Sequence, residues 1–158
     1  MGDNPKIVWL KRYLNLQRQV DNREETLARY ENAQYLPAMP DSDGSKHTPG
    51  RSDRMANATV RYMEQKQKIT PIILACKAKM QAIEDAIYAI DDPLEQEVLI
   101  LRYIEGSEGY RLMKWRDVAL AMYHKDDEAD ITRVTRLHGA ALLSLQMEDD
   151  LNDEENDL

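Results

Sequence analysis

The sequence of 158 residues contains no phenylalanine, one cysteine, six glycines and six prolines. The single cysteine, Cys76, excludes an intrachain disulfide and suits a reducing compartment, so we expect a cytoplasmic protein. Nothing matches the glycine-rich phosphate loops of nucleotide-binding proteins. The longest apolar run, residues 69–76, is far shorter than the roughly 20 residues that a membrane span needs. We therefore expect no membrane partner, no small-molecule substrate and no cofactor.

Side chains for catalysis or metal binding are also scarce. His47, His124, His138 and Cys76 are scattered, without the spacing of zinc ligands. Residues 41–44 begin like a calcium loop, but its twelfth position is Ser52 rather than a bidentate glutamate. No nucleophile stands beside a candidate base. We predict that the chain is not an enzyme and has no metal site.

Charge is concentrated at the end of the sequence. The formal net charge is −8, and residues 148–158 contain seven acidic residues and no basic one. Because like charges at this density repel one another, residues 148–158 are predicted to form a disordered acidic tail. This tail serves either as a solubilising end or as an arm that occupies a basic surface of this protein or of a partner, in competition with nucleic acid.

Two segments, about 5–34 and 53–91, carry apolar residues at alternating spacings of three and four. This is the period of a coiled-coil seam. The seam positions are Trp9, Tyr13, Leu16, Val20, Leu27, Tyr30, Ile73, Met80, Ile83 and Ile87. Pro71 is expected to kink or stop the second helix, or to begin a new one. With a loop at 35–52, residues 1–91 are predicted to form an antiparallel helical hairpin or part of an oligomeric coiled coil.

The pattern changes after Asp91. Asp92 and Pro93 are typical of a helix start, and the following helix is expected to end at Gly106. A short helix around Trp115, a turn at 123–127 and a final helix to about 145 follow. The small residues expected at close helix contacts are Ala119, Gly139 and Ala140. Residues 92–147 are therefore predicted to be an all-α helix-turn-helix domain.

Three stretches of this domain carry a family resemblance. Residues 94–106, with Val98-Leu99-x-Leu101-Arg102-Tyr103-Ile104-Glu105-Gly106, resemble the first helix of region four of bacterial sigma factors. Residues 115–122 and 136–142 look like its next helix and the end of its recognition helix. Together with Tyr13-Leu14 and the loop around Met39-Pro40, they resemble small phage-borne transcription regulators of the RinA/ArpU kind. The resemblance implies sequence-specific DNA binding in a phage or prophage transcription circuit, without catalysis.

The final helix supplies the candidate DNA contacts. Base-reading candidates are Thr132, Arg133, Thr135 and Arg136, since Arg reads guanine and Thr suits bases or phosphates. Candidates for phosphate contact are Lys114, Arg116, His124 and Lys125. His138 either touches a phosphate or packs inside the domain. The loop after Gly106 is longer than the family's, and four acidic residues at 126–130 would face the phosphates of DNA.

Two functions remain open. One is a DNA-binding regulator whose N-terminal helices form a homo-oligomer or contact RNA polymerase. The other is a phage assembly or DNA-packaging protein, similar to a small terminase subunit, in which the helical hairpin is the functional part. The resemblance favours the first function, and the acidic turn favours the second.

Overall fold

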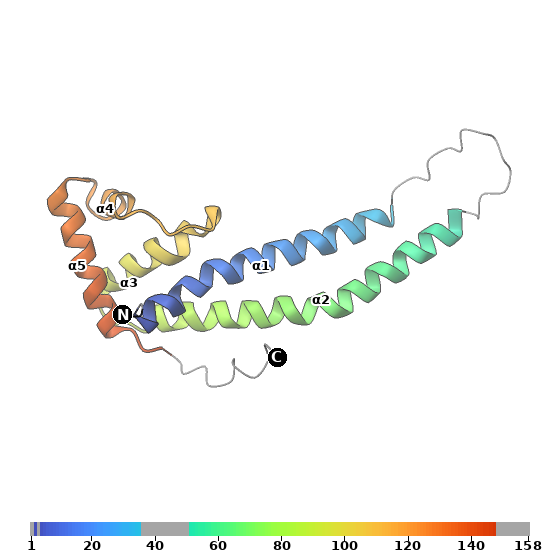
Figure 1. The fold of residues 1–158 in the computed structure, drawn as a ribbon, viewed down its shortest axis with the longest axis horizontal. Helices are drawn as coiled ribbons and strands as arrows, with labels where there is room; N and C mark the ends of the chain where they lie inside the picture. The colour runs from blue at the N-terminus through green and yellow to red at the C-terminus, as the bar shows by residue number, and fades with distance from the viewer. Residues whose placement is uncertain (1, 3, 36–50, 148–158) are drawn as a thin grey trace. The chain divides into compact units, whose positions relative to one another are not determined.

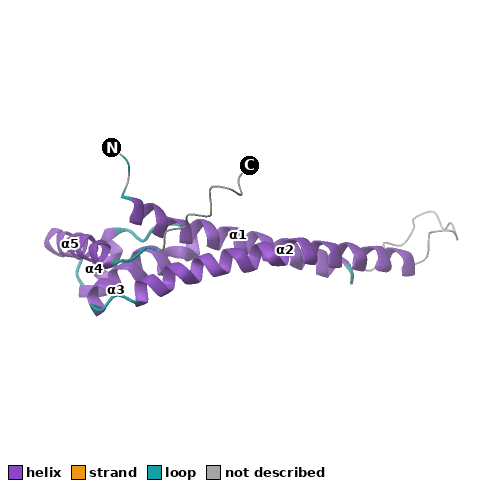
Figure 2. Ribbon diagram, turned by 90° about the horizontal axis from the view of Figure 1, so that it is seen from below, coloured by secondary structure: helices purple, strands orange, loops and turns teal. Residues whose placement is uncertain are grey.

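The computed structural model describes residues 2, 4–35 and 51–147, and its elements are helices and helical turns (Figure 1). They are α1 (Pro5–Ala33), α2 (Arg51–Tyr88), α3 (Pro93–Leu99), a π-helical turn η1 (Ile100–Ile104), a 3₁₀ turn η2 (Glu105–Gly109), α4 (Trp115–Tyr123) and α5 (Glu128–Ser144). Figure 2 shows no strand in this part of the chain, which confirms the predicted all-α class. The predicted acidic tail and nearly all of the predicted loop at 35–52 lie outside the described residues.

The helices form two compact units whose borders differ from the predicted ones. The composite unit joins the residues up to Arg18 with those from Ala78 onward, and the hairpin unit consists of Gln19–Lys77. The predicted border at residue 91 falls inside the composite unit, because side chains tie the start of α1 and the end of α2 to the helices that follow. Lys6 donates from Nζ to the carbonyl of Leu142 at 2.7 Å. Gln96 donates to the carbonyls of Tyr88 and Ile90, which lie at the end of α2 and just after it.

In the composite unit, the seam positions of α1 and α2 are buried. They are Trp9, Tyr13, Leu16, Met80, Ile83 and Ile87. The hydroxyl of Tyr13 donates to the carboxylate of Glu84 at 2.6 Å and so links α1 to α2. Burial, followed by the Glu84 carboxylate, raises the pKa of Tyr13 and keeps its phenol protonated. Leu10 and Leu14 are also buried, so a wider face of α1 is covered than a two-helix seam would require.

The two helices of the hairpin unit run antiparallel, and fewer of their seam residues are buried toward the end of α1 and the start of α2. The contacts between its helices join Gln19 to Cys76, Glu24 to Lys77, and Gln34 to Thr59. Val20 and Ile73 are buried, whereas Leu27 and Tyr30 are half-buried. Polar residues explain the loss. Arg23 in α1 and Thr59 and Lys66 in α2 occupy positions that continue the spacing of three and four, and all three are exposed.

Proline and glycine behave differently from the sequence expectation. Pro71 is exposed and lies inside α2, which neither stops nor restarts there. Gly106 does not cap a helix, because helical turns continue through η2. A Cβ on Gly106 would lie 2.7 Å from the carbonyl oxygen of Arg111 and 2.8 Å from the amide nitrogen of Met113. The close approach of this backbone, rather than a helix end, therefore requires glycine here.

In the helices that follow Asp91, the structure confirms one prediction and corrects another. Asp92 accepts a hydrogen bond from the amide of Leu94 at 2.9 Å, and Pro93 is the first residue of α3, as predicted. Gly139 is exposed, and a Cβ there would meet nothing within 4 Å, so the predicted close helix contact at this residue is wrong. Ala119, by contrast, is fully buried.

Candidate nucleic-acid interface

A short turn joins helices α4 and α5 in the composite unit. α4 ends at Tyr123, and the next residue, His124, caps it in a left-handed conformation with φ of 61°. α5 begins after Asp127, whose carboxylate accepts a hydrogen bond from the amide of Asp130 at 3.0 Å. Both α3 and α4 pack against α5, as Figure 1 shows. The turn of residues 124–127 therefore lies between two well-defined helix ends: α4 ends at a left-handed residue, and the start of α5 is capped by Asp127.

A cluster of polar and aromatic side chains, buried or half-buried, holds α5 against the other helices of this unit. The hydroxyl of Tyr103 lies 2.8 Å from Nε2 of His138, and both side chains are buried. The ring of Trp115 meets that of His138 edge-on, with centroids 4.8 Å apart. The guanidinium carbon of Arg102 lies 4.2 Å from the centre of the Trp115 ring. Nη1 of Arg102 donates a hydrogen bond to the carbonyl of Met113. Side chains from η1, α4 and α5 thus fix the orientation of α5.

His138 is a packing residue. Burial, with the Arg102 charge as a second cause, lowers the pKa of His138 to about 4. The imidazole is therefore neutral at pH 7. Burial also raises the pKa of Tyr103, so the phenol keeps its proton. A neutral, buried imidazole bonded to Tyr103 is not available to a phosphate, which decides between the two roles considered for this histidine.

The base-reading candidates lie on the outer face of α5. Thr132, Arg133 and Arg136 are exposed, and Thr135 is half-buried. The hydroxyls of Thr132 and Thr135 donate to the carbonyls of Glu128 and Thr132 in their own helix. Each oxygen keeps its capacity to accept a hydrogen bond. The guanidinium carbon of Arg133 lies 4.7 Å from the centre of the Tyr123 ring, which links α5 to the end of α4.

The phosphate-contact candidates surround the turn. Lys114 precedes α4, and Lys125 follows His124; all three are exposed. Nε of Arg116 lies 2.5 Å from Oδ2 of Asp126, while the Arg116 side chain stays 70% exposed. Arg116 thus pairs with one acidic residue of the turn, and this pairing partly neutralises the charge of Arg116.

The acidic turn has structural roles. Asp126 pairs with Arg116, and Asp127 caps α5. Hydrogen bonds from Asp130 lower the pKa of Asp127, whereas the nearby Asp127 carboxylate raises the pKa of Asp130. The cations at and near the turn are Lys114, Arg116, Lys125, Arg133 and Arg136, and the acids are Asp117, Asp126, Asp127, Glu128 and Asp130. Because the two groups are equal in number, this face is polar without being strongly basic.

The sequence does not reveal that Arg102, Tyr103, Trp115 and His138 form one cluster. These residues come from three separate elements, and no period joins their positions. A second feature that sequence reasoning missed is a hollow beside α1, lined in part by Arg18 and Tyr110.

No protein-family model, no curated protein and no solved structure matches this chain. None of the described helices combines the length and apolar character needed to cross a membrane. Within the same residues, no three side chains of His, Cys, Asp or Glu are grouped so that they could hold a metal ion.

Proposed function

We propose that the protein is a sequence-specific DNA-binding transcription regulator of phage or prophage origin, with α5 as its recognition helix. The observation that carries the proposal is the outer face of α5. Thr132, Arg133 and Arg136 are exposed there, while the opposite face of the same helix is held by His138. A recognition helix needs this division between a fixed inner face and a polar outer face.

The chemistry of these side chains suits base reading. An arginine can donate two hydrogen bonds to guanine in the major groove, and threonine can contact bases or phosphates. Arg133 and Arg136 are three residues apart and lie on one side of the helix. The balanced charge around the turn supplies little general attraction to phosphates. Affinity in this proposal therefore depends on specific contacts, and the N-terminal helices assist by oligomerisation or by contact with RNA polymerase.

The test is a binding titration with promoter DNA of the phage or host at several salt concentrations. Arg133→Ala with Arg136→Ala is compared with Arg54→Ala and Arg61→Ala, two exposed arginines of α2. The first pair should lower affinity by about 1–3 kcal/mol for each arginine–base interaction that it removes. The control pair removes the same charge and should change affinity little. Equal affinities of the two double variants, or no binding by the native chain at low salt, would contradict the proposal.

A second candidate function, an assembly or packaging protein, rests on the outer face of α2. Val60, Met63 and Leu74 are each at least half exposed and lie on one side of the helix. Exposed apolar side chains in a row are typical of a protein contact. In that case Val60→Ser with Leu74→Ser should abolish self-association or partner binding, while the arginine pair of α5 has no effect.

A further inference from the structure

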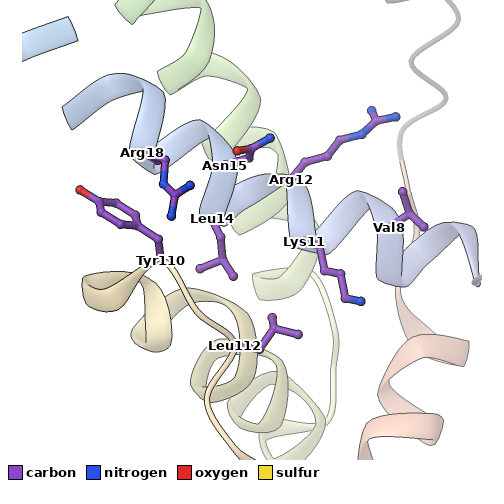
Figure 3. A pocket seen from close by; sticks show the side chains of 8 residues that line it. All are labelled: Val8, Lys11, Arg12, Leu14, Asn15, Arg18, Tyr110 and Leu112. Atoms are coloured by element: carbon purple, nitrogen blue, oxygen red, sulfur yellow. The ribbon is translucent and has the colours of Figure 1, made fainter. Parts of the chain in front are cut away.

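A hollow of about 430 Å³ lies in the composite unit, between α1 and the segment that follows η2 (Figure 3). Its lining residues are Val8, Lys11, Arg12, Leu14, Asn15, Arg18, Tyr110 and Leu112. We call this hollow the α1 groove. In Figure 3, Leu14 points from α1 toward the segment that carries Tyr110 and Leu112.

The lining of the α1 groove combines positive charge with an apolar floor. Three of its side chains are cationic and none is acidic. Lys11 and Arg18 are exposed, and the guanidinium carbon of Arg18 lies 5.1 Å from the centre of the Tyr110 ring. Leu14 and Leu112 contribute apolar surface between these charges. A fitting ligand therefore carries several negative charges together with an apolar group.

The backbone at Tyr110 is unusual. Its φ is 54°, in the left-handed region that a residue with a bulky side chain rarely adopts. Such a conformation costs free energy unless surrounding contacts hold it. The Tyr110 ring lies beside the Arg18 guanidinium on the wall of the α1 groove.

We propose that the α1 groove is the docking site of the chain's own acidic C-terminal segment, residues 148–158. This segment contains seven acidic residues and no basic one, and it includes Leu151 and Leu158. The composition of the segment is thus complementary to the α1 groove in charge and in apolar character. Carboxylates of the segment pair with Lys11 and Arg18, and a leucine packs against Leu14 and Leu112.

The length of the segment permits this docking. Eleven extended residues span at most about 36–40 Å. The end of α5 is anchored near the start of α1, because Lys6 bonds to Leu142 at 2.7 Å. From Lys6, the positions of Lys11 and Arg18 are about 8 Å and 18 Å along a helix whose diameter is about 10–12 Å. The segment is therefore long enough to reach the lining residues.

The test measures how fast a glutamate-specific protease cleaves the full chain after Glu154. Lys11→Glu with Arg18→Glu should raise the cleavage rate at least about threefold, because cleavage of a docked segment follows the population of its released form. Arg54→Glu with Lys68→Glu makes the same charge change on exposed residues of α2 and should leave the rate unchanged. High salt should raise the rate of the native chain toward that of the groove variant.

Several results would overturn the proposal. One is a native chain that is cleaved as fast as the free peptide 148–158. Another is protection that disappears on dilution, which would assign the α1 groove to the segment of a second copy. A third is a Lys11→Glu, Arg18→Glu variant that loses DNA affinity but is cleaved at the native rate. This result would assign the α1 groove to nucleic acid. Because the cleavage assay contains no DNA, its outcome is independent of the role proposed for α5.

Discussion

The hydroxyl of Tyr103, on η1, lies 2.8 Å from Nε2 of His138, on α5, and both side chains are buried. This single contact joins the segment that follows α3 to the candidate recognition helix. It also satisfies two polar groups that would otherwise be costly to bury. This pair, which does not reach the outer face of α5, therefore contributes to the orientation of that helix.

Removal of the Tyr103 hydroxyl should destabilise the composite unit. Tyr103→Phe keeps the ring but leaves a buried imidazole nitrogen without its partner, so we expect a loss of about 1–3 kcal/mol in the free energy of unfolding. Chemical denaturation followed by circular dichroism measures this loss. Tyr123→Phe makes the same chemical change at a half-buried ring and is the control. Equal effects of the two substitutions would show that the Tyr103–His138 bond does not contribute to stability.

Stability should fall in acid because His138 is neutral when folded. Its pKa is about 4 in the folded state against 6.5 for an ordinary histidine. Between these values the unfolded chain binds more protons than the folded chain, so stability decreases as the pH falls from about 6.5 toward 4. The loss is on the order of 1–3 kcal/mol, after allowance for partial solvent screening. The difference in unfolding free energy between the native chain and His138→Gln, measured across this pH range, should change accordingly. A constant difference would refute the assignment.

Two glycines should respond in opposite directions to alanine. Gly139 is exposed in the middle of α5, and its added Cβ would meet nothing. Gly139→Ala should therefore stabilise the chain by about 0.5–1 kcal/mol through better helix propensity. Gly106→Ala should destabilise it, because the Cβ would lie 2.7 Å from a backbone oxygen. Thermal unfolding of both variants tests the pair, and a destabilising effect at Gly139 would show an undetected contact on this face.

Features that repeat along the sequence could be predicted from it. The spacings of three and four placed Trp9 and Ile83 in a buried seam, and Asp92 with Pro93 marked the start of α3. Local rules also gave the turn between α4 and α5. In each case the physical cause lies within a few residues of the feature.

Features that depend on distant residues could not be predicted. Nothing in the local sequence indicates that Tyr103 pairs with His138. The same is true of the hydrogen bond from Arg102 to the carbonyl of Met113. The need for glycine at position 106 comes from a chain segment that returns toward it. A stop or a new helix start was among the expectations for Pro71, but α2 continues through this residue, which lies on its exposed side. Sequence patterns thus located the helices, whereas tertiary packing set the borders between the two units.

The acidic residues at positions 126–130 give a further test of the proposed DNA contact. Asp130 lies in the first turn of α5, and the neighbouring Asp127 carboxylate raises its pKa, so its negative charge is disfavoured where it stands. Asp130→Asn removes that charge and leaves the capping carboxylate of Asp127 in place. If α5 enters the major groove, DNA affinity should rise about two- to threefold, the effect of one charge about 7 Å from a phosphate in water. Glu31→Gln, an exposed acid of α1 in the hairpin unit, is the matched control. Since Asp130→Asn leaves the arginines untouched, an unchanged affinity in the same salt titration would place the start of α5 away from DNA.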